Sequence, residues 1–142
     1  DVAVVRTPSN DGWVYVTDFD GYERVILRGK DPDNYIYAGG ADVRNATGNL
    51  LSEYFEIVEV RNGVKNVLSS SKPGTNKDFR IEIRGNTISA FIDAVKNDPT
   101  SGTLHLRSTS TFLQNDPLAT YFGIGFNRGG FAINEFTFEA YD

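Results

Sequence analysis

Closely spaced carboxylates are the residues of this chain best suited to acid–base chemistry. Hydrolysis of a glycosidic bond needs two carboxyl groups about 5 to 10 Å apart on one surface. The two candidate pairs within one segment are Asp18/Asp20 and Glu135/Glu139. The first pair lies in a predicted turn, and the second lies on the predicted outward face of the last strand. Glu53, Glu56 and Glu59 follow at steps of three, which alternate between the faces of a strand, so they cannot form one catalytic cluster.

Nucleophilic and zinc chemistry have still less support. The sequence has no cysteine, one histidine and no Gly-x-Ser-x-Gly motif, so we expect no thiolate, no catalytic triad and no cysteine-based zinc site. His105 stands between Leu104 and Leu106, and alternation places it on the opposite face, as a packed or solvent-facing imidazole. A glycoside hydrolase or lyase is therefore the least favoured hypothesis for this chain.

Aromatic rings beside planar polar side chains favour a different chemistry, the binding of a sugar. A pyranose ring stacks on an exposed aromatic face while its hydroxyls bond to Arg, Asn, Gln, Asp or Glu side chains. The candidate ligand-binding residues are Arg80, Glu82, Arg84, Ser89, Phe91, Asn34, Tyr35, Tyr37 and Arg128, with Trp13, Arg44, Tyr121 and Asn127 as further loop candidates. Of these, Trp13 is expected in the core more than on a binding platform.

The hairpin that carries the first five candidates is the clearest element of the chain, over Asp78 to Asp93. Its apolar residues alternate with charged ones, and Gly85-Asn86 supplies a tight two-residue turn. Pairing Arg84 with Thr87 puts every apolar pair on one face: Ile83/Ile88, Ile81/Ala90 and Phe79/Ile92. Phe91 is then the one apolar residue of the polar face, as a stacking platform would be.

A second interpretation of this polar face is left open. Arg80, Glu82 and Arg84 would form a solvated charge ladder, and Phe91 would pack beneath a neighbouring loop. Both interpretations fit the sequence.

The remaining segments are short apolar or β-branched runs between turn residues. The predicted strands are 2–5, 13–17, 22–28, 34–38, 53–61, 64–69, 102–107, 119–126 and 131–141. Asn62-Gly63 is predicted to join two of them in a hairpin, and 127–130 to join the last pair. The segment 39–52 is predicted as a long polar loop with at most an edge strand. About ten or eleven strands predict an all-β sandwich or barrel.

Composition limits the domain count and the partners. The 142 residues fit a single domain over 1–142, and the absence of Met even at position 1 predicts that it is excised from a longer protein. The 19 acidic residues exceed the 14 basic ones, so no nucleic-acid partner is expected. No apolar run approaches the roughly 20 residues that span a bilayer, so no membrane insertion is expected.

Four segments follow one another in a recognisable order. The first, 28–37, is RGKDPDNYIY and contains R-x-x-D-x-x-N-Y, and the second, 53–71, is EYFEIVEVRNGVKNVLSSS and contains two predicted strands joined at Asn-Gly. The third, 79–93, is FRIEIRGNTISAFID and is a predicted hairpin that ends in Asp. The fourth, 122–142, is FGIGFNRGGFAINEFTFEAYD and is a predicted closing hairpin that begins with Gly-x-Gly. Together they resemble laminin-G-like domains of the concanavalin A-like lectin and glucanase superfamily, over Tyr22 to Tyr141. The resemblance implies a two-sheet antiparallel jelly-roll sandwich and a sugar-binding or surface-recognition role. The Glu-x-Asp-x-x-Glu motif of the related glucanases is absent.

The same resemblance implies a structural calcium ion near the chain termini. Asp18-Phe19-Asp20-Gly21 is similar to half of a D-x-D-G calcium loop but lacks the distal Glu of an EF-hand. Asp18, Asp20 and Asp142 are the candidate calcium ligands. The favoured alternative is that these Asp and Gly residues only form a turn.

The sequence and the resemblance together predict a non-catalytic carbohydrate-binding module. Its partner would be a polysaccharide or glycan on a cell surface, and its location extracellular or on a virion surface. An accessory domain of an enzyme and a receptor-binding domain of a phage tail are the two settings that fit. The alternative from another class is a structural or oligomerisation domain of a viral or surface assembly, which would form a homo-oligomer.

Overall fold

Two antiparallel β-sheets form the molecule. The computed structural model describes residues 2–7, 9–17, 23–71, 78–126 and 135–140, and within these ranges eleven strands and no helix are present. The six-stranded sheet has the order β1 (Val2–Arg6), β10 (Tyr121–Phe126), β3 (Glu23–Asp31), β4 (Asn34–Arg44), β5 (Leu50–Arg61) and β6 (Val64–Ser71). The five-stranded sheet has the order β11 (Glu135–Ala140), β2 (Gly12–Thr17), β7 (Phe79–Arg84), β8 (Thr87–Ile92) and β9 (Thr103–Thr109).

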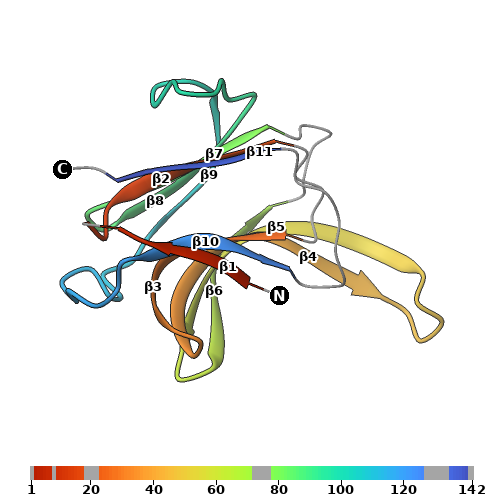
Figure 1. The fold of residues 1–142 in the computed structure, drawn as a ribbon. Helices are drawn as coiled ribbons and strands as arrows, with labels where there is room; N and C mark the ends of the chain where they lie inside the picture. Colours follow the sequence, from red (N-terminus) through yellow and green to blue (C-terminus); the bar gives the residue numbers. More distant parts are fainter. Residues whose placement is uncertain (1, 8, 18–22, 72–77, 127–134, 141–142) are drawn as a thin grey trace.

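The two sheets lie face to face, as Figure 1 shows, and the chain crosses from one to the other several times. The predicted all-β, two-sheet antiparallel jelly-roll sandwich is therefore confirmed. In the described ranges no helix is long and apolar enough to cross a membrane.

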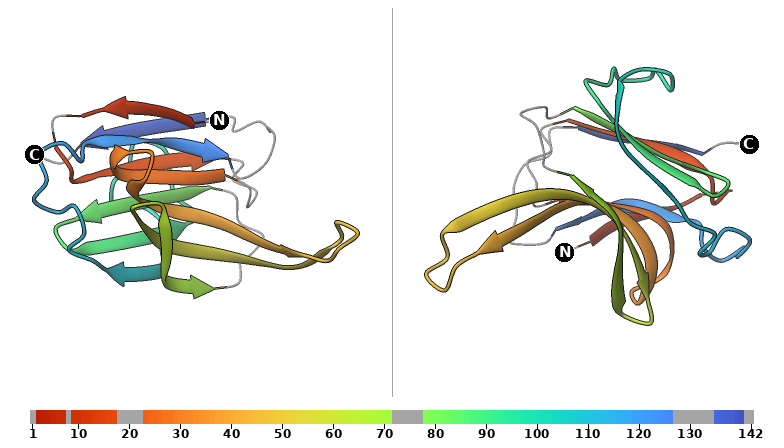
Figure 2. Two further views of the ribbon diagram at one scale, coloured as in Figure 1. Left: turned by 90° about the horizontal axis from the view of Figure 1, so that it is seen from below. Right: turned by 180° about the vertical axis from the view of Figure 1, so that it is seen from behind.

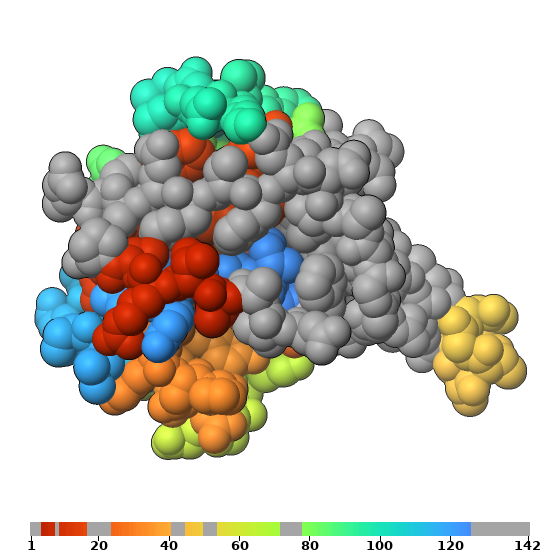
Figure 3. Space-filling view, in the orientation of Figure 1, coloured from red at the N-terminus to blue at the C-terminus, as the bar shows by residue number. Residues whose placement is uncertain are grey.

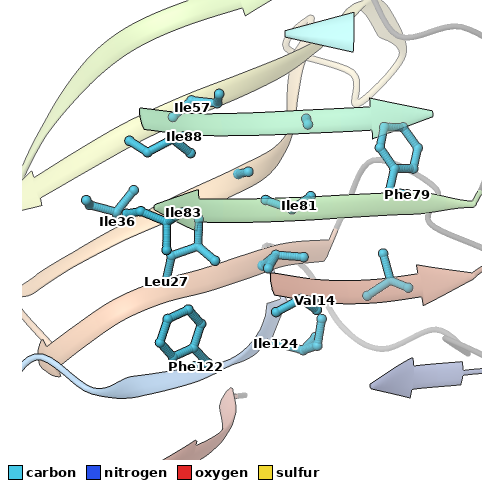
Figure 4. Packing of buried hydrophobic residues seen from close by; sticks show 14 of the residues in the cluster. Val14, Leu27, Ile36, Ile57, Phe79, Ile81, Ile83, Ile88, Phe122 and Ile124 are labelled. Atoms are coloured by element: carbon cyan, nitrogen blue, oxygen red, sulfur yellow. The ribbon is translucent and has the colours of Figure 1, made fainter. Parts of the chain in front are cut away.

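The core fills the space between the sheets with side chains from alternate strand positions. Ile81, Ile83 and Ile88 of the five-stranded sheet face Leu27, Ile36 and Ile57 of the six-stranded sheet (Figure 4). The rings of Phe55 on β5 and Phe79 on β7 stack with their centroids 5.1 Å apart. Burial of these apolar surfaces is the main force that holds the sheets together.

The two predicted two-residue hairpins are confirmed. In the β7–β8 hairpin Ile83 pairs with Ile88, Ile81 with Ala90 and Phe79 with Ile92, which is the predicted register. In the β5–β6 hairpin Arg61 pairs with Val64. Asn62 and Gly63 have φ values of 50° and 79°, so both central residues adopt the positive φ that a type I′ turn requires.

Two predictions of chain path are wrong. The segment 39–52 is not a long loop, because β4 continues to Arg44 and β5 begins at Leu50, and the two strands pair along their whole length. Gly39 and Gly40, at the start of this segment, lie in the ladder opposite Glu56 and Phe55. The space-filling view shows the hairpin tip, residues 45–49, standing clear of the molecular body (Figure 3).

The second wrong prediction concerns the final two strands. β10 and β11 do not pair with each other, because β10 lies between β1 and β3 in one sheet while β11 pairs with β2 in the other. Each strand has the alternating composition of a hairpin arm, and alternation alone does not reveal which sheet an arm joins.

The outer face of the six-stranded sheet is concave. The β3–β4 and β5–β6 turns bend away from the five-stranded sheet in Figure 1 and in Figure 2 (right). In the same views the β4–β5 hairpin extends sideways from the body of the molecule. Register irregularities within β3–β4 and β5–β6 pairing accompany this bending.

Arg28 closes one end of the sandwich. It has a positive φ of 48° beside the irregularity in β3, and its side chain is fully buried. The guanidinium donates to the carbonyl of Asn10 at 2.8 Å, to the carbonyl of Gly85 at 2.7 Å and to the carboxylate of Asp11. The five-stranded sheet and the six-stranded sheet are thereby tied together at this end.

Candidate functional site

The concave outer face of the six-stranded sheet carries a continuous band of apolar positions. One row of paired residues crosses all six strands, namely Val4, Gly123, Ile26, Tyr37, Val58 and Val67. Outward-facing residues of a sandwich are usually polar, so this row departs from the usual alternation. Figure 2 (left) looks onto this face.

A groove of about 570 Å³ lies over the β1–β10–β3 side of this face. The residues that line it are Val4, Arg24, Ile26, Gly29, Lys30, Asp31, Pro32, Tyr35, Tyr121 and Gly125. The volume is within the range of small-ligand sites, about 300 to 1,000 Å³.

Glycines keep the groove open. β10 presents Tyr121, Gly123 and Gly125 at its outward positions, so two of the three have no side chain. A Cβ at Gly29 would lie only 3.1 Å from the Cβ of Tyr121, because these residues face each other across the β3–β10 ladder. The absence of side chains here lets Tyr121 and Tyr35 stand as the walls of the groove.

Cationic side chains lie over the tyrosine rings of this face. The guanidinium carbon of Arg24 is 4.4 Å from the ring centroid of Tyr37, and that of Arg6 is 5.0 Å from the ring centroid of Tyr121. Tyr35 packs beside Tyr37 with ring centroids 6.1 Å apart. Burial raises the pKa of the Tyr37 phenol, while the charge of Arg24 acts to lower it.

Hydrogen bonds between two turns fix one end of the groove. The Asn34 side chain donates to the Asp31 carboxylate at 3.0 Å and accepts from the Asn62 N–H at 3.0 Å. The Gly63 N–H donates to the Asp33 carbonyl at 2.9 Å. These bonds hold the β3–β4 and β5–β6 turns side by side, and the bond from Asn34 lowers the pKa of Asp31.

Comparison with known proteins does not assign a function to this face. No protein-family model matches the chain, and no curated protein matches it. Among solved structures, the chain is similar to the carbohydrate-binding module CBM66 from Bacillus subtilis, at 14% identity and a TM-score of 0.48, over 88% of this chain and 70% of that one. At this TM-score the likeness carries no argument about family or function.

The predicted ligand residues fall into two separate groups. Tyr35 and the further candidate Tyr121 line the groove, Tyr37 lies buried beneath Arg24, and Asn34 holds the turns. The hairpin residues lie on the opposite sheet, across the core. One ligand cannot contact both groups at once.

The loop 93–102 covers part of the polar hairpin face and leaves the end at Arg84 exposed. Arg80 is only 3% exposed, because its Nε donates to the Ser101 carbonyl at 2.9 Å and its guanidinium lies 3.9 Å over the Phe91 ring. It also forms a salt bridge with Glu82 at 3.0 Å. This arrangement agrees with the second interpretation in that Phe91 is covered, by Arg80 and the loop that binds it, but Arg80 is buried and is not part of a solvated charge ladder.

Trp13 lies under the same loop. It is buried in a small cluster with Tyr15 and Ala94 on the outer face of the five-stranded sheet. Trp13 is therefore a core residue, as expected. Ser89 on β8, separated from Trp13 by Glu82 on β7, is fully buried and accepts from Arg107, while Arg84 at the hairpin end is exposed.

Several candidates lie outside the described residues. They are Asp18, Asp20, Asp142, Asn127 and Arg128, and the side chain of Arg44 is likewise not described. Within the described ranges, no group of three His, Asp or Glu residues is placed to hold a metal ion. The calcium site therefore stays a prediction.

His105 and the β5 glutamates have structural surroundings. A β-bulge in β9 turns His105 edge-on toward Phe55 and Phe79, at centroid distances of 5.8 and 6.5 Å, and the Ser71 hydroxyl lies 3.0 Å from its Nε2. Glu56 pairs with outward-facing Gly39, whereas Glu59 pairs with core residue Ile36. The two carboxylates therefore lie on opposite faces, as predicted.

Sequence reasoning missed Arg24, Arg6 and the two β10 glycines as part of the site. The signal was present in FGIGF, where glycine occupies alternate positions and leaves one face of the strand without side chains. Nothing local in the sequence distinguishes Arg24 from an ordinary exposed strand arginine, since its place over Tyr37 depends on the β3–β4 register.

Proposed function

We propose that this protein is a non-catalytic carbohydrate-recognition module that binds a glycan in the groove on the concave face. The observation that carries the proposal is the pair of half-buried tyrosines, Tyr35 and Tyr121, at the walls of a 570 Å³ groove with a glycine-rich floor. Tyrosine faces stack on the C–H patches of a pyranose ring, and a floor without side chains lets the ring approach the sheet.

The polar groups around these rings complete the chemistry. Arg24, Lys30 and Asp31 line the groove and supply donors and acceptors for sugar hydroxyls. Lys30 is held by Asp116 at 2.9 Å and Asp31 by Asn34, so both are positioned before a ligand binds. Preorganised polar groups reduce the entropy lost on binding.

The finer parts of the proposal concern setting and location. A shallow, open face suits a polymer or cell-surface glycan, which fits an extracellular or virion-surface module. An enzyme accessory domain and a phage tail receptor-binding domain both need to bind such a glycan. Membership of the concanavalin A-like superfamily and a calcium ion held by Asp18, Asp20 and Asp142 belong to the same proposal, and repeating the binding assay in EDTA tests the ion.

Binding of a glycan panel to two variants of one tyrosine tests the function. We expect Tyr35→Ala to weaken binding about tenfold, because a tenfold change in affinity is about 1.4 kcal/mol, near the upper end of the free energy of an aromatic stacking contact. Tyr35→Phe should bind like the wild type because the ring remains. Isothermal titration calorimetry with the best glycan of the panel measures both. No affinity of the wild type for any glycan, with or without calcium, would refute the proposal.

A structural domain that assembles with copies of itself is the second candidate. Both edge strands of the six-stranded sheet expose apolar side chains: Val4 and Val5 on β1 are 43% and 49% exposed, and Val64 and Val67 on β6 are 69% and 49% exposed. Exposed apolar edge strands favour pairing with another chain. A stable oligomer in sedimentation velocity, dissociated by Val64→Lys and without glycan affinity, would favour this candidate.

A further inference from the structure

We propose that the glycan recognised by this groove is acidic, with a carboxylate that pairs with Arg24 and lies within reach of Lys65. This inference rests on the proposed function and names the chemical class of its ligand. It is carried by the position of Arg24, the second cation beside it and the absence of a salt bridge to either among the described side chains.

Arg24 is held in place at the groove by the sheet beneath it. Its guanidinium lies over the Tyr37 ring, and Tyr37 is fixed because it is buried against Val58 and Val60. The Nε of Arg24 is buried and has no hydrogen-bond partner in the described part of the chain. A buried donor without a partner is costly, and a turn of the guanidinium toward an acceptor brought by a ligand would remove that cost.

A second cation approaches the same ring from β6. The Nζ of Lys65 is 6.0 Å from the Tyr37 centroid. Burial lowers the pKa of Lys65, the neighbouring charge of Arg24 lowers it further, and Glu56 offsets part of this effect. Among the side chains that the structure describes, neither Arg24 nor Lys65 forms a salt bridge within 4.0 Å. Two cations that repel each other form a site that a bound anion would stabilise.

The other charges of the groove are already compensated. Lys30 pairs with Asp116, and the carboxylate of Asp31 accepts from Asn34 and from the N–H of Asp33. The net charge of −5 does not oppose a local anion site, because salt screens exposed charges beyond about 8 Å at physiological ionic strength. Glu56 lies on the same face, opposite Gly39, and offsets only one of the two charges of Arg24 and Lys65, so the net charge of these three groups is positive.

A carboxylate on a sugar ring matches this geometry better than a hydroxyl does. The guanidinium of Arg24 offers a planar fork that binds a carboxylate with two parallel hydrogen bonds. The ring of a uronic or sialic-type sugar would stack on Tyr35 or Tyr121, which line the groove with Arg24. A sulfate ester on a neutral sugar has a similar charge, so the test must separate these two sources.

The experiment compares matched pairs of glycans on the full chain. Polygalacturonate, alginate and a sialylated glycan are each paired with the carboxyl-reduced or desialylated form, beside neutral glucans and a sulfated galactan. We expect wild-type binding to the carboxylate members, at least tenfold weaker binding to their neutral partners, and a loss of affinity between 50 and 500 mM NaCl. Weaker binding to sulfated galactan than to the carboxylate members assigns the site to carboxylates.

Three variants locate the charge that is responsible. Arg24→Gln and Lys65→Gln should each weaken binding to the acidic member and not to its neutral partner, whereas Arg107→Gln, an exposed arginine on the opposite sheet, should change neither. Lys65 is exposed, so its variant tests the inference even if Arg24→Gln fails to fold.

Two outcomes would overturn the inference in different ways. Equal binding to a carboxylate glycan and its neutral partner would refute the acidic ligand but leave the proposed carbohydrate function standing. No detectable binding to any glycan of the panel would refute both the acidic ligand and the proposed carbohydrate function. Tight binding to sulfated galactan alone would also refute the carboxylate assignment.

Discussion

Arg28 joins three segments that lie far apart in the sequence. Its fully buried guanidinium bonds to Asn10, Asp11 and Gly85, and burial acts to lower its pKa while Asp11 acts to raise it. Arg28→Ala would leave the partly buried carbonyls of Asn10 and Gly85 without this donor, and the Asp11 carboxylate with only the N–H of Gly85. We expect a loss of about 3 kcal/mol in the free energy of unfolding, measured by urea denaturation.

The matched control for this prediction is Arg107→Ala. Arg107 is exposed and makes one side-chain hydrogen bond, to Ser89, so its removal should cost less than about 1 kcal/mol. Equal effects of the two substitutions would contradict the role assigned to Arg28.

Glu59 should make stability depend on pH in the acidic range. Burial acts to raise the pKa of this carboxyl, but hydrogen bonds from Ser110 and Arg61 and the charge of Arg61 together lower it. A carboxyl with a lowered folded pKa stabilises the fold fully above its unfolded pKa, about 4.3, and loses that contribution as the pH falls through the folded value. The stability advantage of wild type over Glu59→Gln should therefore shrink on acidification from pH 7.

Urea denaturation of both proteins over this pH range measures the difference. Asp31, Asp98 and Asp116 also have lowered pKa values, but they are present in both proteins and cancel. A difference that stays constant with pH would contradict the prediction.

Single-residue roles were only partly predictable from the sequence. Residue type alone makes Tyr35 and Tyr121 ligand candidates, and both line the groove. Arg80 and Phe91 stand on the predicted face, but the loop that covers them comes from residues whose path the strand pattern does not determine. Coverage of a face is a tertiary property, so it cannot be read from the alternation of one hairpin.

The loop 93–102 is the element that closes the outer face of the five-stranded sheet. Gly102 has a φ of 96°, and a Cβ there would lie 2.9 Å from both the Ile92 carbonyl oxygen and the Phe91 Cβ. Gly102→Ala should therefore displace the loop and expose Trp13, the only tryptophan of the chain. We expect a red shift of the fluorescence emission and a stability loss of about 1–3 kcal/mol.

Gly48→Ala is the control for this element. Gly48 also has a positive φ, 85°, but a Cβ there would meet nothing within 4 Å, and the residue lies at the tip of the β4–β5 hairpin. It should reduce stability by about 1 kcal/mol without changing the emission. An unchanged emission in Gly102→Ala would show that the loop does not protect Trp13.

The elements that the sequence predicted well are those whose partners are local. The β5–β6 and β7–β8 hairpins have two-residue turns, so turn chemistry and alternation together determine their register. The wrong predictions concern 39–52, where two glycines occur inside a ladder, and the β10–β11 pair, whose strands join different sheets. Long-range pairing of this kind depends on how the whole chain packs.

The two outer faces of the whole molecule differ in a way that suits one binding surface. On the five-stranded sheet a loop covers Trp13, Arg80 and Phe91. On the six-stranded sheet the concave face stays open, with tyrosines, cations and glycines around a groove. An open aromatic face opposite a covered one is the basis for placing the ligand on the six-stranded sheet.

The measurement that tests this placement most directly compares the two faces in one binding assay. The same glycan is titrated into three proteins: the wild type, Tyr121→Ala and Arg84→Ala. Tyr121 lies in the groove, and Arg84 lies at the exposed end of the hairpin face. Unchanged Trp13 fluorescence first verifies that the variants are folded. A ligand site on the six-stranded sheet predicts that Tyr121→Ala weakens binding about tenfold and that Arg84→Ala binds like the wild type. Loss of binding in Arg84→Ala with unchanged binding in Tyr121→Ala would contradict it and place the ligand on the opposite sheet.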